Sequence, residues 1–587
     1  MKVVYLLSVF YLIISFLLLK KTNKKLSIVS SVIYTICLLF CYNTVIVCFY
    51  SFFKINGSLL VLSLFNYGIG SILNFISFRR KEIQKFTICK KELITVCCVL
   101  IVAFLVGFFR FSGFKIINYE TGDPAIHYRS ALHFARELEI LDTNNSKDLV
   151  YNDFNRFMPI SYINSGLLLN VFSEFSSYKV FVIYDVLCLI LSSLLFFITI
   201  FNLFQKKSVH IFYCFILTLL YLLAFPLNNL VFGFCYLGLG IMAINLLFLT
   251  VSYFKDFNEQ ILFKLIMLFI LTFSLFFSYY LFMPCVYLAL GIYYIYLWKK
   301  NKISVGKLFL YGIVTLIIPF IIGIVYFVLP SFINESSMSI LKKINLYGYI
   351  YSNITPMYLF FVVSGIIIYK LVRYKEKIDY FKLNLYIISI YILIFFVLYI
   401  FKLSEVYYFY KLFYLYWFFV IIFLGQLLVK WKKYVYVIFS LILVGMGIVY
   451  YFPNSKVTLF LTTINIYNWN IRTFNEDRII FTESELEIMD ESVKYKDICE
   501  YKNEFLILGS KFKNFWFYSY TGSIPVFNYQ YVDHHQLYET NIGFRFWENL
   551  ANYDCLVYFY EDSVVDYDKD NYEVLYSNED GAILKKK

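Results

Sequence analysis

The sequence predicts a polytopic α-helical membrane protein of about fourteen spans, followed by a small α/β domain at the C-terminal end. Hydrophobic residues make up 61% of the 587 residues and charged residues only 16%, whereas soluble domains are usually about half apolar and a quarter charged. Apolar runs long enough to cross the hydrocarbon layer as helices, roughly 18 residues or more, recur before residue 452 and then stop. We therefore expect a membrane domain over 1–452 and a water-soluble domain over 453–587.

The apolar runs follow one another with mostly short connections. The candidate spans are residues 3–19, 27–50, 57–77, 92–110, 178–204, 210–226, 231–253, 261–278, 280–298, 307–329, 356–372, 383–402, 410–430 and 433–452. The first is expected to be a retained span, because no small-residue cleavage site follows it. Pro226 and Pro284 leave open that 231–253 and 261–298 form half-helices, broken inside the protein.

The basic residues indicate which loops face the cytoplasm. Lys and Arg gather in every second connection, namely Lys20–Lys25, Arg79–Lys91, Lys206 and Lys207, Lys255, Lys299–Lys307, Lys370–Lys382 and Lys430–Lys433. Cytoplasmic loops carry this excess of positive charge. The alternation places the N-terminus, the long loops 111–177 and 330–355, and the C-terminal domain outside the cytoplasm.

The net charge of +13 does not indicate a nucleic-acid partner. The basic residues lie in the short loops, and the last 135 residues carry 13 Lys and Arg against 22 Asp and Glu. The soluble part is therefore acidic, and the basicity of the chain reflects its topology. Membrane lipids are the expected surroundings of the remainder.

The C-terminal domain is expected to contain two helices and several strands. ESELEIMDESVKY predicts a helix, EFLILGS and DCLVYFYED predict buried strands, KNFWFYSYTG begins a second helix, and YEVLYSNEDGAILKK predicts a hairpin that turns at Glu579–Gly581. Cys499 and Cys555 are the only cysteines of this domain. They form a disulfide if the domain is extracytoplasmic, or remain two free thiols.

Acidic residues gather in the first long loop. Of the 17 acidic residues before residue 453, seven lie in one stretch of it, between residues 120 and 153: Glu120, Asp123, Glu137, Glu139, Asp142, Asp148 and Asp153. Pro124 fits the first turn of a helix with Asp123 as its N-cap. His127 then lies on the same helical face as Asp123. The pattern fits either a catalytic carboxylate above the membrane or an ordinary solvated loop.

The D-P-x-x-H run at Asp123–His127, the following Ala and Arg residues, and the overall layout resemble the GT-C class of bacterial polyprenyl-phosphate-sugar-dependent glycosyltransferases. Glu405–Lys411 is similar to a Tyr-Tyr-x-x-Lys entry to a late span. Two features differ from the family pattern. Asp123 follows Gly122 rather than a second carboxylate, and the tail has no WWDYG-type signature. The resemblance implies a GT-C-like fold in a bacterial plasma membrane.

The resemblance also implies a reaction. A sugar would pass from a polyprenyl-phosphate donor to a glycan or lipid acceptor during assembly of a cell-envelope polysaccharide, with Asp123 as general base. His127 would orient Asp123, bind phosphate, or hold a divalent cation such as Mg or Mn together with Asp123; no other cofactor is expected. The candidate substrate-binding residues are Glu120, Arg129, Arg136, Glu335, Lys402, Glu405, Tyr408 and Lys411. Lys411 either meets the lipid phosphate, snorkels to the interface or pairs with Glu405.

Two other functions fit the same layout. A transporter or flippase for a lipid-linked glycan would share the membrane spans, although such carriers usually place charged groups at mid-membrane. An O-antigen-type polysaccharide polymerase would share the transfer chemistry and take an oligosaccharide donor. The concentration of acids in an external loop favours the enzyme.

Overall fold

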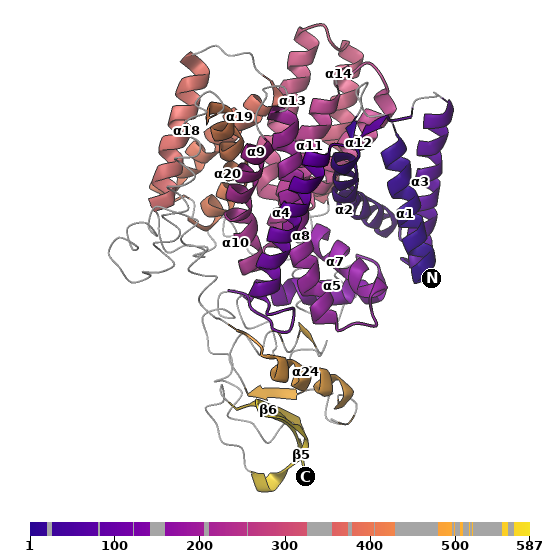
Figure 1. Ribbon diagram of the computed structural model, residues 1–587, viewed down its shortest axis with the longest axis vertical. Coiled ribbons are helices and arrows are strands. Elements are labelled where there is room, and N and C mark those ends of the chain that lie inside the picture. The colour runs from indigo at the N-terminus through magenta and orange to yellow at the C-terminus, as the bar shows by residue number, and fades with distance from the viewer. Residues whose placement is uncertain are drawn as a thin grey trace.

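The helical part and the C-terminal domain form an elongated molecule, with the domain below one end of a helical bundle (Figure 1). The structure is a computed structural model. It describes all residues except 20–25, 80–82, 121, 141–158, 205–210, 255, 326–354, 374–378, 404–405, 429–478, 496–497, 499–504, 509–515, 517–518, 521–554 and 561–568.

Apolar helices make up the bundle. They are α1 (Lys2–Leu18), α2 (Ile28–Phe52), α3 (Leu59–Arg79), α4 (Lys90–Arg110), α8 (Ser177–Phe204), α9 (Ile211–Leu222), α10 (Phe225–Phe232), α11 (Cys235–Tyr253), α12 (Ile261–Phe276), α13 (Met283–Lys299), α14 (Val305–Gly312), α15 (Ile318–Gly323), α18 (Thr355–Arg373), α19 (Tyr380–Ile400) and α20 (Val406–Leu428). The π-helical turn η3 (Ile313–Ile317) joins α14 to α15, and the 3₁₀ turn η2 (Tyr280–Phe282) precedes α13. A two-residue pair, β1 (Leu26–Ser27) and β2 (Phe86–Thr87), links two connections.

Each predicted span before residue 431 overlaps one or more of these helices, and span 433–452 lies outside the described residues. Within the described part, nine helical segments are long and apolar enough to cross a membrane, and four more are shorter. The chain is thus an integral membrane protein by composition and helix length. The count of fourteen spans stays a prediction.

Helix breaks fall near the two prolines. The backbone turns at Ala224, and Pro226 then occupies the first turn of the short helix α10, where its missing N–H costs nothing. Pro284 likewise starts α13 after η2. The stretch 231–253 is broken at Gly233 and Phe234 and then continues as the unbroken helix α11, and 261–298 is divided into α12 and α13 by η2.

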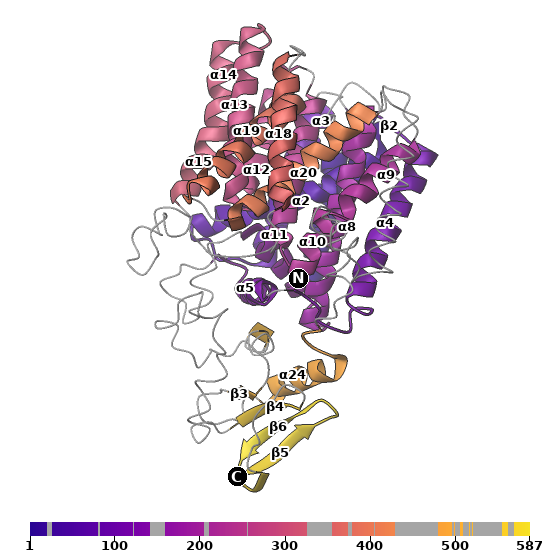
Figure 2. The ribbon, with the colours of Figure 1, turned by 90° about the vertical axis from the view of Figure 1, so that its left-hand side faces the viewer.

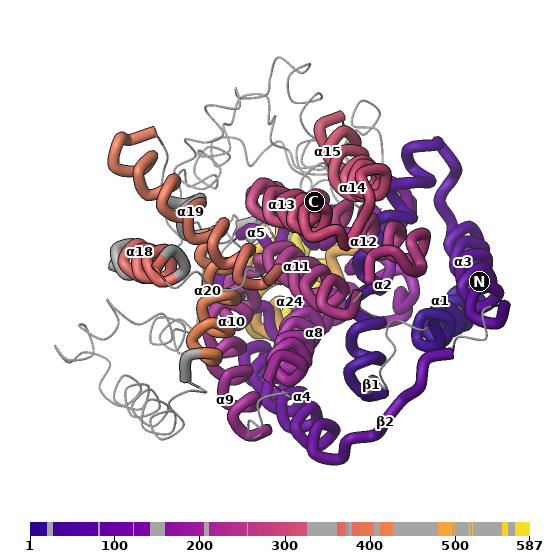
Figure 3. The backbone as a smooth tube through the Cα atoms, turned by 90° about the horizontal axis from the view of Figure 1, so that it is seen from above, coloured from indigo at the N-terminus to yellow at the C-terminus, as the bar shows by residue number. Residues whose placement is uncertain are grey.

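The centre of the bundle is formed by α2, α8 and α11, most of whose residues are buried inside the protein (Figure 3). The outer helices instead keep large apolar side chains exposed, among them Phe75, Phe109 and Ile321. Exposed apolar surface of this extent suits a lipid environment.

The first long loop is partly helical. It contains α5 (Asp123–Glu137) and α7 (Pro159–Val171); α7 was not predicted, because Asn164, Ser165 and Gly166 interrupt its apolar pattern. Both helices lie at the end of the bundle that faces the C-terminal domain, and the N-terminal end of α1 lies at that same end (Figure 1).

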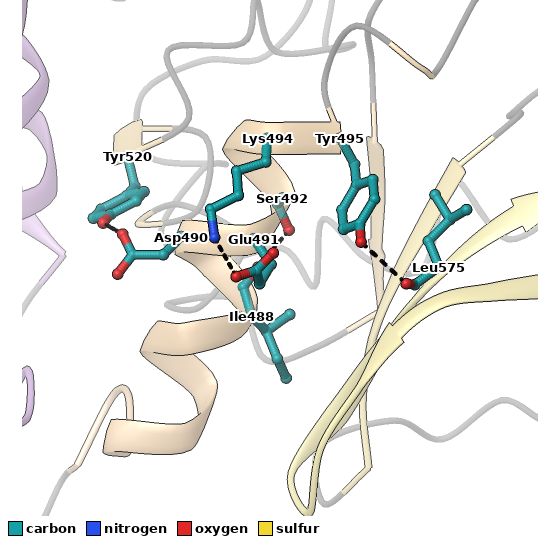
Figure 4. Close-up of polar contacts among 8 residues, drawn as sticks. All are labelled: Ile488, Asp490, Glu491, Ser492, Lys494, Tyr495, Tyr520 and Leu575. Carbon is teal, nitrogen blue, oxygen red and sulfur yellow. Dashed lines mark hydrogen bonds and ion pairs between the residues drawn. The ribbon is translucent and has the colours of Figure 1, made fainter.

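The described parts of the C-terminal domain match their predictions, whereas the second helix, predicted to begin at KNFWFYSYTG, lies mostly outside the described residues. The helix α24 (Glu483–Tyr495) packs on a sheet with strand order β3 (Phe505–Leu508), β4 (Cys555–Phe559), β6 (Gly581–Lys586) and β5 (Tyr572–Ser577), preceded by the short turn η8 (Lys569–Asn571). β3 runs parallel to β4, and β5 and β6 form the predicted hairpin. Tyr495 of α24 donates a hydrogen bond to the Leu575 carbonyl of β5, 3.2 Å (Figure 4). Cys555 is disulfide-bonded; Cys499 lies outside the described residues.

Candidate active site

Helix α5 presents a stripe of two polar side chains. Gly122 is the N-cap and Asp123 the first helical residue, with Pro124 in the first turn. The prediction of Asp123 as N-cap is thus wrong by one position, because the chain enters helical geometry one residue earlier. Between residues 122 and 131, only Asp123 and His127 keep part of their surface accessible. They are four residues apart, and so lie on one face of the helix.

The connection between α10 and α11 forms the wall opposite this face. Gly233 has a φ of +70° and lies so close to Pro124 that a Cβ atom here would overlap the proline ring. Glycine alone permits both the left-handed backbone and this close approach. Tyr236 follows at the start of α11, and its ring lies 5.1 Å from the His127 ring.

Lys411 completes the site from α20. Its side chain is 2% exposed, and its Nζ donates a hydrogen bond of 2.7 Å to the Tyr236 hydroxyl. Three aromatic rings surround the ammonium: Nζ lies 4.5 Å from the ring centre of Phe234, 5.2 Å from that of Tyr236 and 5.7 Å from that of Tyr279. Ring faces attract a cation. Asp123 supplies the negative charge that interacts with Lys411.

The position of Lys411 is fixed one turn further along α20. Tyr414 donates a hydrogen bond to the Asn228 side-chain carbonyl, and its ring lies 4.4 Å from Phe225. Both partners belong to α10, the short helix that leads into the Gly233 turn. One element therefore positions Lys411, and the turn that follows it contacts α5.

The segment between α4 and α5, residues 111–122, is tied to the bundle by buried polar contacts; we call it the α4–α5 linker. Glu120 forms an ion pair of 3.2 Å with Arg110, with side chains 5% and 0% exposed, and its backbone N–H donates to the Val231 carbonyl. Tyr119 donates a hydrogen bond of 2.7 Å to Asp185. These bonds hold the linker that leads into Asp123, and they give Glu120 a structural partner.

His127 is neutral at ordinary pH. Burial lowers the pKa of its imidazole to about 4; the Asp123 carboxylate opposes that shift and Lys411 adds to it. A neutral imidazole donates or accepts a hydrogen bond, and it can ligate a metal ion. Among the described residues, however, no group of three His, Cys, Asp or Glu side chains is placed to hold a metal ion, so Asp123 and His127 form at most part of such a site.

The other predicted site residues are dispersed. Arg129 is 4% exposed on α5, Arg136 is exposed in its last turn, and Lys402 is exposed just beyond α19. Tyr408 lies in α20, but its side chain lies outside the described part, as do Glu335 and Glu405. The aromatic residues around Lys411 were not predicted, since aromatic residues make up 22% of the chain.

A comparison of this sequence with protein-family models and with curated proteins finds no match. The features of this chain that bear on function are therefore the geometry of Asp123, His127, Tyr236 and Lys411 and the resemblance in the first loop.

Proposed function

We propose that this chain is a membrane glycosyltransferase that moves a sugar from a polyprenyl-phosphate donor to a hydroxyl of a glycan or lipid acceptor. The observation that supports this most is the meeting of a carboxylate and a buried ammonium at one end of the bundle. Asp123 comes from the first long loop and Lys411 from a late helix; the two charges interact electrostatically, and Lys411 also donates to Tyr236. A general base and an anion-binding group at the membrane boundary are what this transfer requires.

The chemistry assigns one role to each side. The acceptor O–H gives its proton to the Asp123 carboxylate while the acceptor oxygen forms a bond to the anomeric carbon. The bond from that carbon to the phosphate oxygen breaks, and its electron pair leaves with the lipid phosphate. The Lys411 ammonium and the Tyr236 hydroxyl are the donors available to that phosphate. His127, being neutral, orients the carboxylate or the acceptor rather than adding positive charge.

Three observations support placing this site outside the cytoplasm. Basic residues gather in alternate loops. The N-terminal end of α1, helix α5 and the C-terminal domain share one end of the molecule (Figure 1). Cys555 of that domain is disulfide-bonded, and disulfides persist in oxidising compartments. The acceptor then belongs to the cell surface, which suits envelope polysaccharide assembly.

The test is cell-free transfer by the full chain in lipid nanodiscs. Undecaprenyl-phosphate hexoses with a radiolabelled sugar serve as donors, and envelope glycans as acceptors. We expect label to move to the glycan with the wild type, and not with Asp123→Asn. Absence of transfer from every donor, or full transfer by folded Asp123→Asn, contradicts the proposal. Movement of intact labelled lipid across a vesicle without a new glycosidic bond supports the transporter instead.

Topology is tested separately with reporter fusions at residues 140 and 520. We expect the reporter at each position to give the signal of an extracytoplasmic location. A cytoplasmic signal at either position contradicts the proposed sidedness, whatever the transfer assay shows.

A further inference from the structure

The C-terminal domain reaches the site helix through Trp516. This side chain is fully buried, and its ring lies 5.7 Å from Tyr119 at an angle of 12° and 5.7 Å from Tyr128 at 32°. Tyr119 precedes Asp123 in the α4–α5 linker, and Tyr128 follows His127 in α5. One side chain of the C-terminal domain therefore contacts the chain on both sides of the candidate catalytic residues.

Tyr520 makes a second contact on the same surface. Its ring lies 6.1 Å from Tyr128 and 6.1 Å from Tyr178 at the start of α8, and its hydroxyl donates a hydrogen bond to Asp490 of α24 (Figure 4). This bond links the contact with α5 to the helix that packs on the sheet. We call Tyr119, Tyr128, Tyr178, Trp516 and Tyr520 the docking cluster.

The docking cluster is an interface rather than a sugar-binding platform. Its members are between 0% and 8% exposed, whereas a platform for sugar stacking needs an accessible ring face. The Trp516 Nε1–H is buried and makes no hydrogen bond within the described part of the chain. A buried donor without a partner is costly. The Nε1–H therefore does not stabilise the contact between the domain and α5, and Trp516 stabilises it through the packing of its ring.

The α4–α5 linker is bonded on both of its sides. On the domain side, the Ile480 N–H donates to the Ile117 carbonyl, 2.8 Å, and Lys115 pairs with Glu483 of α24. On the bundle side, the linker is held by the Tyr119–Asp185 and Arg110–Glu120 contacts already described. The linker thus runs between the C-terminal domain and the bundle before it enters α5. Figure 2 shows that α5 itself also lies between the bundle and the domain.

The second half of α5 has different supports. Gly166 of α7 lies against the Ala131 carbonyl so closely that a Cβ would crowd it, and Asn170 donates a hydrogen bond of 2.7 Å to the Ala135 carbonyl. These contacts hold residues 131–135 against α7. The first half relies on the Pro124 contact with Gly233 and on the docking cluster around Tyr128.

Helix geometry links the docking cluster to the catalytic stripe. Successive residues are about 100° apart around a helix, which places Tyr128 about 100° from His127 and about 140° from Asp123. With side chains about 6 Å from the axis, a rotation of about 10° moves each of them by about 1 Å. A rotation that loosens Tyr128 from Trp516 therefore turns Asp123 and His127 away from Lys411.

We infer that Trp516 is a positioning residue: the docked C-terminal domain fixes the rotation of α5, so that Asp123 and His127 face Lys411 and Tyr236. The inference rests on the proposed function for its kinetic consequence. The mechanical part, support of α5 by the domain, does not depend on it. Tyr520 plays the lesser part, through its bond to Asp490.

The experiment compares wild type, Trp516→Ala and Trp516→Phe as full chains in nanodiscs, by hydrogen–deuterium exchange. We expect faster exchange over residues 123–131 in Trp516→Ala, near wild-type exchange in Trp516→Phe because a ring is retained, and unchanged protection of β4–β6. Unchanged exchange of α5 in Trp516→Ala overturns the inference. Lost protection of the sheet, with Trp516→Phe failing to restore α5, overturns it as well, because the effect is then general unfolding.

Kinetics supply the second readout. We expect Trp516→Ala to lower kcat about 10²-fold, the usual effect of a 1 Å misplacement, while the KM for undecaprenyl-phosphate hexose stays within about twofold because Lys411 lies on α20. Trp516→Phe should restore most of kcat. A rise in KM at constant kcat contradicts the inference. If the wild type transfers no sugar, the proposed function fails and the exchange comparison still tests the positioning.

Discussion

The two sides of the candidate site hold their charges in opposite ways. On α5, Asp123 and His127 lie on an amphipathic helix and keep accessible surface, so water or a substrate can reach them. On α20, Lys411 is 2% exposed among aromatic rings, where its charge is compensated by the Tyr236 hydroxyl, the ring faces and the field of Asp123. A charge in such surroundings is screened little. The α5 side is thus suited to exchanging protons, and the Lys411 side to attracting an anion.

The largest loss of activity is expected when Asp123 is replaced. Replacing Asp123 with Asn removes the proton acceptor and keeps the shape, and general-base catalysis typically contributes about 10²–10⁴-fold. We expect kcat to fall by that factor in the transfer assay, while the affinity for the donor, measured by titration in nanodiscs, changes little. Asp123→Glu serves as the control, because it keeps a carboxylate and should retain more activity than Asp123→Asn. Equal activity of the two variants would remove proton transfer from the role of Asp123.

On the Lys411 side, we expect substitutions to change the affinity for the lipid phosphate. A hydrogen bond to a charged group contributes about 1.5–3 kcal/mol, so Lys411→Met should weaken binding of undecaprenyl phosphate by about 10- to 10²-fold. The protein should nevertheless stay about as stable as the wild type, because the substitution removes the desolvation cost of a buried ammonium and the Asp123 carboxylate left behind keeps surface accessible to water. Ligand titration and thermal unfolding of the same preparation measure both effects.

Lys411→Arg is the matched control, because it keeps the charge. The planar guanidinium needs more room among Phe234, Tyr236 and Tyr279 than the ammonium does, so we expect partial recovery of phosphate binding. Undiminished phosphate affinity in Lys411→Met contradicts a role for this residue in anion binding.

His127 gives the α5 side a pH dependence of stability. Its folded pKa of about 4 lies below the ordinary value of about 6.5, so the unfolded chain binds more protons between these values. Stability present above pH 6.5 is therefore lost as the pH falls toward 4, by up to about 3 kcal/mol. Thermal unfolding of wild type and His127→Gln at pH 7 and 4.5 measures this. Taking the difference between the two proteins cancels the effect of the carboxylates that they share. An identical pH response in both contradicts a lowered pKa of His127 in the folded protein.

The two sides of the site also differ in how much of them could be predicted from the sequence. Asp123 and His127 were identifiable because a rare carboxylate, a helix-starting proline and a histidine follow one another within one turn. The bounds of α24 and the β5–β6 hairpin were equally local, set by helical periodicity and by an Asp-Gly turn. The N-cap at Gly122 differed by one residue, since several residues at a helix start compete for that position.

The other side of the site depends on contacts between distant segments. Phe234 and Tyr236 lie at the start of α11 and Tyr279 lies just before η2, and their rings meet around Lys411. Nothing local distinguishes them from the 57 Tyr and 67 Phe of the chain. Trp516 is similar, because its importance arises from Tyr119 and Tyr128, which lie far away in sequence. These residues come together only where helices pack closely in the folded protein, as at Gly233.

The smallest effect is expected at Tyr236, which contacts both sides of the site. It still distinguishes the two sides, because affinity and kcat should change by different amounts. Tyr236→Phe removes the hydroxyl that accepts from Lys411 and keeps the ring beside His127. A single hydrogen bond contributes about 0.5–1.5 kcal/mol, so phosphate affinity should fall by about 3–10-fold, with kcat nearly unchanged because His127 keeps its contact with the ring at position 236. Titration with undecaprenyl phosphate and steady-state kinetics measure the two quantities. A drop in kcat larger than the drop in affinity would assign the hydroxyl to the α5 side of the site, and would place proton transfer within reach of Tyr236.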